Sequence, residues 1–151
     1  MKGGEKMNIN LKNCETSAQA VTKICYNEST KNLDFKVRCE NLEDLKKCVQ
    51  IIKEYNDFNY KTINTALNEY ASLKKYYDLF ELAIAREGSP AMYISIFMFS
   101  ISNKYKEANQ IKEFSGKDFE VRMKALAGEI QADECDFYQD GCRFTCRLWW
   151  D

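Results

Sequence analysis

Residues 135–150 read CDFYQDGCRFTCRLWW and contain the strongest local folding signal in the chain. The dipeptide Asp140-Gly141 lies between two short runs rich in aromatic residues, a pattern typical of a two-residue type I′ hairpin. We predict a C-terminal β-hairpin turning at this dipeptide, with Cys135 directly opposite Cys146. Because successive side chains of a strand point to opposite sides, one side of the hairpin should face the core. Its residues are Cys135, Phe137, Phe144, Cys146, Leu148 and Trp150.

The opposite side of this hairpin contains the best candidate binding residues: Tyr138, Arg143, Arg147 and Trp149. Guanidinium groups beside aromatic rings can hold a phosphate, a nucleobase or an acidic protein surface, and these residue types dominate interface hot spots. We therefore predict a binding surface there. The alternative is an ordinary outer strand face, with Arg143 stacked on Tyr138 and Arg147 paired diagonally with Asp136.

Two strands are expected near the N-terminus. Residues 33–40, LDFKVRCE, alternate apolar and polar side chains without a fault, which predicts a half-buried strand. Residues 20–26, AVTKICY, also have strand character, and residues 27–32 supply turn chemistry between the two runs. An N-terminal β-hairpin follows from this interpretation.

About four helices are expected between the hairpins. The first follows Asn41 as N-cap, with Asp44 three residues later as in a capping box. A second begins after residues 57–59, and its apolar stripe from Ile63 to Ile84 keeps helical spacing until a glycine cap at Gly88.

The segment after that glycine is harder to assign. Ser89-Pro90 is typical of a new helix start. Residues 91–101 are apolar nearly all round but too short to cross a bilayer, which takes about 20 residues. They fit a buried helix or a buried strand, and the charged residues that follow favour the helix. A last helix should open at Ser115, with Asp118 completing its capping box. Its inward residues are expected to be Phe119, Met123, Leu126, Ala127 and Ile130.

The predicted fold class is α+β, with the strands forming one antiparallel sheet. A chain of 151 residues, 45% of them hydrophobic, fits one domain, which we place at residues 7–151. Residues 1–6 are expected to be a disordered leader, since Lys2-Gly3-Gly4-Glu5 can be encoded by a bacterial ribosome-binding site spaced correctly before Met7.

The seven cysteines suggest reduced thiols in a cytoplasmic protein. No apolar signal segment opens the chain, so most cysteines are expected to be small core residues. There is no C-x-x-C pair and no histidine, so neither a metal nor a cofactor is expected. Cys135 and Cys146 would face each other in a hydrogen-bonded pair, a position less suited to a disulfide.

Familiar enzyme motifs are missing. Without histidine the commonest general base is absent, and no glycine-rich phosphate loop or nucleophile elbow occurs. A net charge of −1 argues against general nucleic-acid binding. The sequence therefore predicts a protein that is not an enzyme and binds neither nucleic acid in general nor a membrane.

We predict a non-enzymatic binding protein of a low-GC Gram-positive bacterium or its phage, because the 17 lysines far outnumber the 5 arginines, as AT-rich coding favours. The expected role is inhibition of a host protein, of the anti-defence (for example anti-CRISPR-like) or immunity type. The alternative is a protein that sequesters a small anionic ligand or nucleotide on the hairpin face. A second candidate surface, which would suit a homodimer contact, is the tyrosine-rich stretch with Tyr70, Tyr76, Tyr77 and Phe80.

Overall fold

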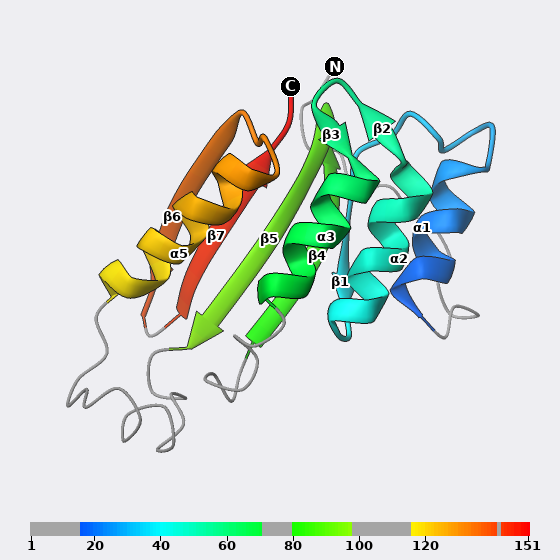
Figure 1. Ribbon diagram of the computed structural model, residues 1–151. Helices are drawn as coiled ribbons and strands as arrows, with labels where there is room; N and C mark the ends of the chain where they lie inside the picture. The colour runs from blue at the N-terminus through cyan, green and yellow to red at the C-terminus, as the bar shows by residue number, and fades with distance from the viewer. Residues whose placement is uncertain (1–15, 71–79, 98–115, 142) are drawn as a thin grey trace.

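The computed structural model describes residues 16–70, 80–97, 116–141 and 143–151. In these residues a five-stranded antiparallel sheet lies behind a layer of helices (Figure 1). In chain order the elements are α1 (Ser17–Cys25), β1 (Phe35–Cys39), α2 (Leu42–Ile52), β2 (Glu54–Tyr55), β3 (Phe58–Asn59), α3 (Tyr60–Tyr70), β4 (Phe80–Glu87), β5 (Ser89–Phe97), α5 (Gly116–Glu129), β6 (Glu134–Asp140) and β7 (Arg143–Trp149). The expected leader, residues 1–6, and the expected helix cap at Ser115 lie outside the described residues.

The main sheet has the strand order β1-β4-β5-β7-β6, and every neighbouring pair is antiparallel. β2 and β3 form a separate two-stranded hairpin between α2 and α3. The predicted α+β class and the antiparallel sheet are therefore confirmed, as is a C-terminal hairpin made by β6 and β7.

The hydrophobic core lies between the sheet and α1, α2, α3 and α5, which all cover the same face (Figure 1). The inward residues predicted for α5 are all buried in it. Trp150, which follows β7, is fully buried. Its ring and that of Phe58 pack edge to face, with ring centroids 4.9 Å apart, and its Nε1 donates to the carbonyl of Ile130 at 3.0 Å. The C-terminal strand is thus tied to both the helix layer and the small hairpin.

The turn of the C-terminal hairpin begins one residue later than predicted, which shifts each cross-strand partner by two positions. Asp140 pairs with Arg143 and Phe137 with Cys146, so Asp140 belongs to the strand and the turn begins at Gly141. Gly141 has φ = +59°, a conformation that glycine adopts without strain. Because side chains alternate with period two, this slip leaves every residue on its predicted face. The predicted core face is confirmed, with Cys135, Phe137 and Phe144 partly buried and the other three members fully buried.

Residues 20–26 are not a strand; all but the last belong to helix α1. Thr16 caps this helix and forms a capping box with Gln19, a pattern present in the sequence as T-x-x-Q. Ala20, Val21 and Ile24 are buried at helical spacing. The second predicted strand of the N-terminal pair is confirmed as β1, but it pairs with β4 instead of with residues 20–26.

The long helix predicted to reach Gly88 is wrong from Phe80 onward, where the chain forms β4; residues 71–79 lie outside the described residues. β4 and β5 are strands joined at Gly88, whose φ of +73° makes a tight turn and not a helix cap. β5 begins with Ser89 and Pro90. Proline has no backbone N–H to donate, which is tolerated near the start of a strand. Leu82 and Ile84 alternate with alanines, which is strand periodicity. For the apolar run after Pro90, the buried strand is correct as far as β5 extends.

A buried carboxylate, Asp44, fastens the first two helices together. Asn41 caps α2 as predicted, accepting from the amide of Asp44 at 2.8 Å. The Asp44 carboxylate accepts from the amides of Ser17 at 3.2 Å, Ala18 at 3.1 Å and Glu40 at 3.2 Å. Burial alone would raise the pKa of Asp44, but these hydrogen bonds outweigh it and hold the pKa below its ordinary value.

Asp44→Asn should therefore lower the free energy of unfolding by about 1–3 kcal/mol at pH 7, since a charged acceptor of three amides is lost. The pKa of Asp44 is lower in the folded chain than in the unfolded chain, where an aspartate has a pKa of about 3.9. Its carboxylate therefore stabilises the folded state above about pH 3.9, and this contribution is lost as the pH falls through the pKa of the folded chain. In urea unfolding, the difference in free energy of unfolding between the wild type and Asp44→Asn should accordingly become smaller below about pH 4. Glu43→Gln, an exposed neighbour on the same turn, is the matched control. An equal loss in both variants would contradict this role.

Candidate functional site

The sheet face opposite the helices is polar and aromatic, and no described helix covers it (Figure 1). We call it the open face. The residues that the strand register assigns to it include Lys36, Arg38, Glu81, Ala83, Ala85, Glu87, Ala91, Tyr93, Ser95, Phe97, Glu134, Asp136, Tyr138, Asp140, Arg143, Thr145, Arg147 and Trp149. Alanines and a serine occupy its middle, while long charged and aromatic side chains surround them.

All four predicted binding residues lie on the open face, on the neighbouring strands β6 and β7. Their exposure differs. Tyr138 is 53% exposed and Trp149 is partly buried. The Arg143 side chain is 43% exposed, whereas that of Arg147 is only 14% exposed. Arg147 is therefore enclosed by its neighbours and presents little of its guanidinium to solvent.

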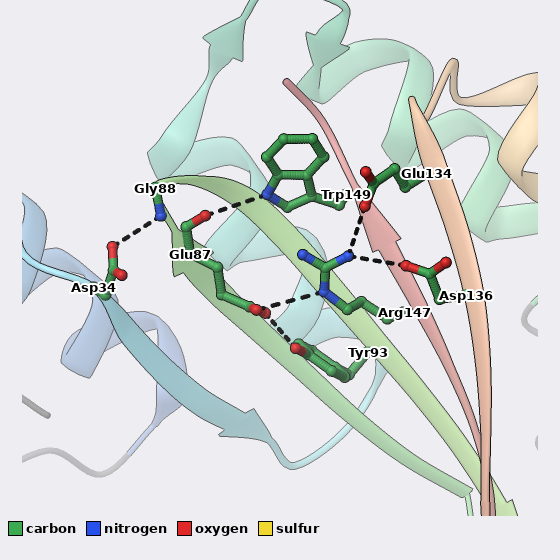
Figure 2. A network of polar contacts seen from close by, with 8 residues as sticks. All are labelled: Asp34, Glu87, Gly88, Tyr93, Glu134, Asp136, Arg147 and Trp149. Carbon is green, nitrogen blue, oxygen red and sulfur yellow. Dashed lines mark hydrogen bonds and ion pairs between the residues drawn. The ribbon is translucent and has the colours of Figure 1, made fainter. Parts of the chain in front are cut away.

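Three carboxylates surround the Arg147 guanidinium (Figure 2). Its Nη1 lies 3.1 Å from both Glu134 and Asp136, and its Nε lies 3.4 Å from Glu87. The alternative interpretation expected Arg147 to pair diagonally with Asp136; the two side chains do form an ion pair, but from directly opposite positions. Burial alone would lower the pKa of Arg147, but the hydrogen bond to Glu134 and the charge of Glu87 raise it above its ordinary value.

Glu87 extends this network along the β4–β5 turn (Figure 2). Its carboxylate accepts from the Tyr93 hydroxyl, and its backbone carbonyl accepts from Trp149 Nε1 at 3.3 Å. Burial and the bond to Glu87 raise the pKa of Tyr93 to about 12, so the phenol stays protonated at neutral pH. Lys36 Nζ on β1 lies 3.9 Å from the centre of the Tyr93 ring. The network therefore reaches all five strands.

A second group, at the opposite end of the open face, joins Arg38 and Arg143 through one carboxylate. Glu81 lies 3.3 Å from Arg38 and 3.0 Å from Arg143, with one carboxylate oxygen facing each arginine. Arg143 also lies over the ring of Phe97, at 6.0 Å. The predicted stacking of Arg143 on Tyr138 is wrong, because the register places Tyr138 opposite Thr145.

The sequence interpretation missed the contributions of β4 and β5, because β4 was expected to be helical and the helix was favoured over a buried strand for β5. The alternation of Glu81, Ala83, Ala85 and Glu87 with apolar residues was the signal that could have found them. The tyrosine-rich surface does not form as predicted: Phe80 begins β4 and so does not share a helix with Tyr70. Tyr76 and Tyr77 lie outside the described residues.

The comparisons with known proteins do not assign a class. No protein-family model matches the sequence, and neither curated proteins nor solved structures give a significant match. Within residues 16–70, 80–97, 116–141 and 143–151, no helix has the length and apolar character needed to cross a membrane. In the same residues no three acidic or cysteine side chains are grouped to hold a metal ion.

Arg147→Met should lower the free energy of unfolding by about 1–3 kcal/mol at pH 7, since Glu87, Glu134 and Asp136 would face one another without their cation. Added salt should narrow this deficit, because it screens the repulsion among the three carboxylates. Urea unfolding at about 0.01 M and at about 1 M salt measures the effect.

The control is Arg143→Met, which removes the guanidinium of a more exposed side chain bound to a carboxylate that Arg38 also holds. We expect a loss below about 1 kcal/mol. If the Arg143 variant lost as much stability as the Arg147 variant, the enclosed position of Arg147 would not be the reason for its effect.

Proposed function

We propose that this chain is a non-enzymatic, cytoplasmic binding protein that inhibits one host protein by docking the open face onto it. The observation that supports this most is the display of Tyr138, Trp149 and two partly exposed arginines on a sheet face that no described helix covers. Exposed aromatic and arginine side chains clustered on one surface are what protein interfaces use as hot spots. Inhibition of the anti-defence or immunity type is the biological role we propose.

The charge arrangement favours a protein over a small anion as the ligand. Arg147 already binds three carboxylates, so an anion would have to displace groups that solvate the guanidinium well. Arg143 likewise binds Glu81. A protein that sequesters a nucleotide or other small anion would need free arginines, and Arg147, one of the two arginines predicted to bind the anion, is already occupied by carboxylates.

The partner should present basic side chains to the Arg147 end of the open face. Three carboxylates and one guanidinium leave an excess of two negative charges there (3 − 1 = 2). Trp149 adjoins them, and an indole ring also attracts lysine or arginine side chains. Such a contact accelerates association and weakens as salt is added.

Tyr138→Ala tests this surface with little risk to the fold, because the side chain is half exposed. The partner is first captured from the lysate of a low-GC Gram-positive host and purified. Titration calorimetry should then show that Tyr138→Ala binds this partner at least about tenfold more weakly than wild type, a loss of about 1.4 kcal/mol, as for a truncated hot-spot tyrosine. Its matched control is Tyr26→Ala, a tyrosine that is 67% exposed at the end of α1 in the helix layer. That variant should bind like wild type.

Three results would contradict the proposal. Equal affinity of both tyrosine variants would place the interface elsewhere. Release of a bound small molecule from the purified chain, with no protein partner whose binding depends on Tyr138, would favour sequestration. Sedimentation as a dimer whose contact is broken by Tyr138→Ala would show that a second copy occupies the open face.

A further inference from the structure

Two cysteines lie beside each other behind the open face. Cys135 on β6 and Cys146 on β7 both point to the helix-covered side, and their sulfur atoms are 3.8 Å apart. They are diagonal neighbours and not directly opposite, since Cys135 pairs with Leu148 and Cys146 pairs with Phe137. Each of the five described cysteines is unpaired. The predicted pairing of Cys135 directly opposite Cys146 is therefore wrong.

The two thiols differ in accessibility. Cys135 is only partly buried and lies on β6, an edge strand of the sheet, whereas Cys146 is fully buried on β7. The hydrogen bond from Cys146 lowers the pKa of Cys135 despite burial, and the charge of Lys124 on α5 lowers it further. The same contact, together with burial, raises the pKa of Cys146. Of the two sulfur atoms, the accessible Cys135 sulfur is therefore the one that ionises more readily and attacks as a thiolate.

We propose that Cys135 and Cys146 form a peroxide-oxidisable dithiol, in which a hydroperoxide converts the reduced pair into a reversible disulfide between β6 and β7. This inference is independent of the proposed binding function, because it rests on the opposite side of the sheet.

The chemistry balances in two steps. The Cys135 thiolate attacks the terminal oxygen of the hydroperoxide, the O–O bond breaks, and the alkoxide leaves with a proton as an alcohol while Cys135 becomes a sulfenic acid. Cys146 then attacks the Cys135 sulfur; the S–S bond forms, the S–O bond breaks, and hydroxide leaves as water with the Cys146 proton. Two thiols are oxidised by one electron each, and the hydroperoxide is reduced by two.

Closing the bond requires the sulfur atoms to approach from 3.8 Å to about 2.05 Å. Because β6 has a neighbour on only one side, it can shift more readily than a central strand. A disulfide formed by pulling strands together is strained and is easily reduced by a dithiol. The pair is therefore suited to reversible oxidation and not to permanent cross-linking.

The other core thiols are poor competitors for peroxide. Cys39 and Cys48 are buried between β1 and α2, and the contact with Cys39 together with burial raises the pKa of Cys48. Burial also raises the pKa of Cys25. None of these three presents an accessible thiolate.

The test treats the purified full chain with one equivalent of hydrogen peroxide at pH 7. Before treatment the unfolded chain should titrate as seven thiols, and afterwards as two fewer, with a mass decrease of two hydrogens. Trypsin cuts after Arg143, so the bridge should join the peptide that contains Cys135 to the peptide that begins at Phe144. Dithiothreitol should restore both thiols.

Single-cysteine variants show which two sulfur atoms form the disulfide. Cys135→Ser should abolish the bridge, while Cys142→Ser, in the same tryptic peptide, should keep it. Cys146→Ala should accumulate a sulfenic acid at Cys135 that dimedone traps; if that variant does not fold, the peptide map of the wild type still decides. A bridge between other cysteines, or oxidation of Cys135 to sulfinic acid without a bridge, would overturn the proposal. So would the survival of all seven thiols.

Discussion

In the part of the chain that the structure describes, helices cover one face of the five-stranded sheet and leave the other uncovered. This one-sided burial determines which side chains of each strand are apolar and which are polar. On the covered face, apolar residues pack with the helix layer. On the other face, side chains must satisfy their charges among themselves or with solvent. Arg147 shows the outcome, because its guanidinium is enclosed by carboxylates from β4 and β6 and stabilises the packing of strands far apart in the sequence. The open face is consequently ordered without being apolar.

An ordered polar face is well suited to binding a partner. Side chains held by mutual ion pairs lose little conformational entropy when a partner docks. In the proposed complex, the excess of acidic groups around Arg147 would favour basic partner surfaces over acidic ones. The same arrangement makes Arg147 more important for stability than for direct contact, and leaves Tyr138 as the residue best placed to touch another protein.

The sequence predicts faces better than it predicts element types. The candidate residues Tyr138, Arg143, Arg147 and Trp149 were assigned to one surface correctly although the turn was misplaced, because a slip of two residues preserves the alternation of side chains. The capping residue Asn41 was found because its chemistry is local. The partner of Arg147 on β4, Glu87, could not be found in this way, since the contact depends on pairing between strands distant in sequence.

The errors have physical causes as well. Residues 20–26 have β-branched and aromatic residues that suit a strand, but the capping box at Thr16 and burial against α2 favour the helix. β4 continued an apolar stripe that also fits helical spacing, and its alanines are compatible with either structure. Short apolar runs of this kind are assigned by tertiary packing and not by their own periodicity.

The adjacent tryptophans provide the most direct test of one-sided burial, because Trp149 lies on the open face and Trp150 is fully buried in the core. They are the two tryptophans of the chain. Acrylamide quenching of fluorescence should show an accessible component in the wild-type protein that disappears in Trp149→Phe, leaving a protected emission from Trp150. Strong quenching in the Trp149→Phe protein, or complete protection in the wild type, would contradict a sheet that is covered on one face and open on the other.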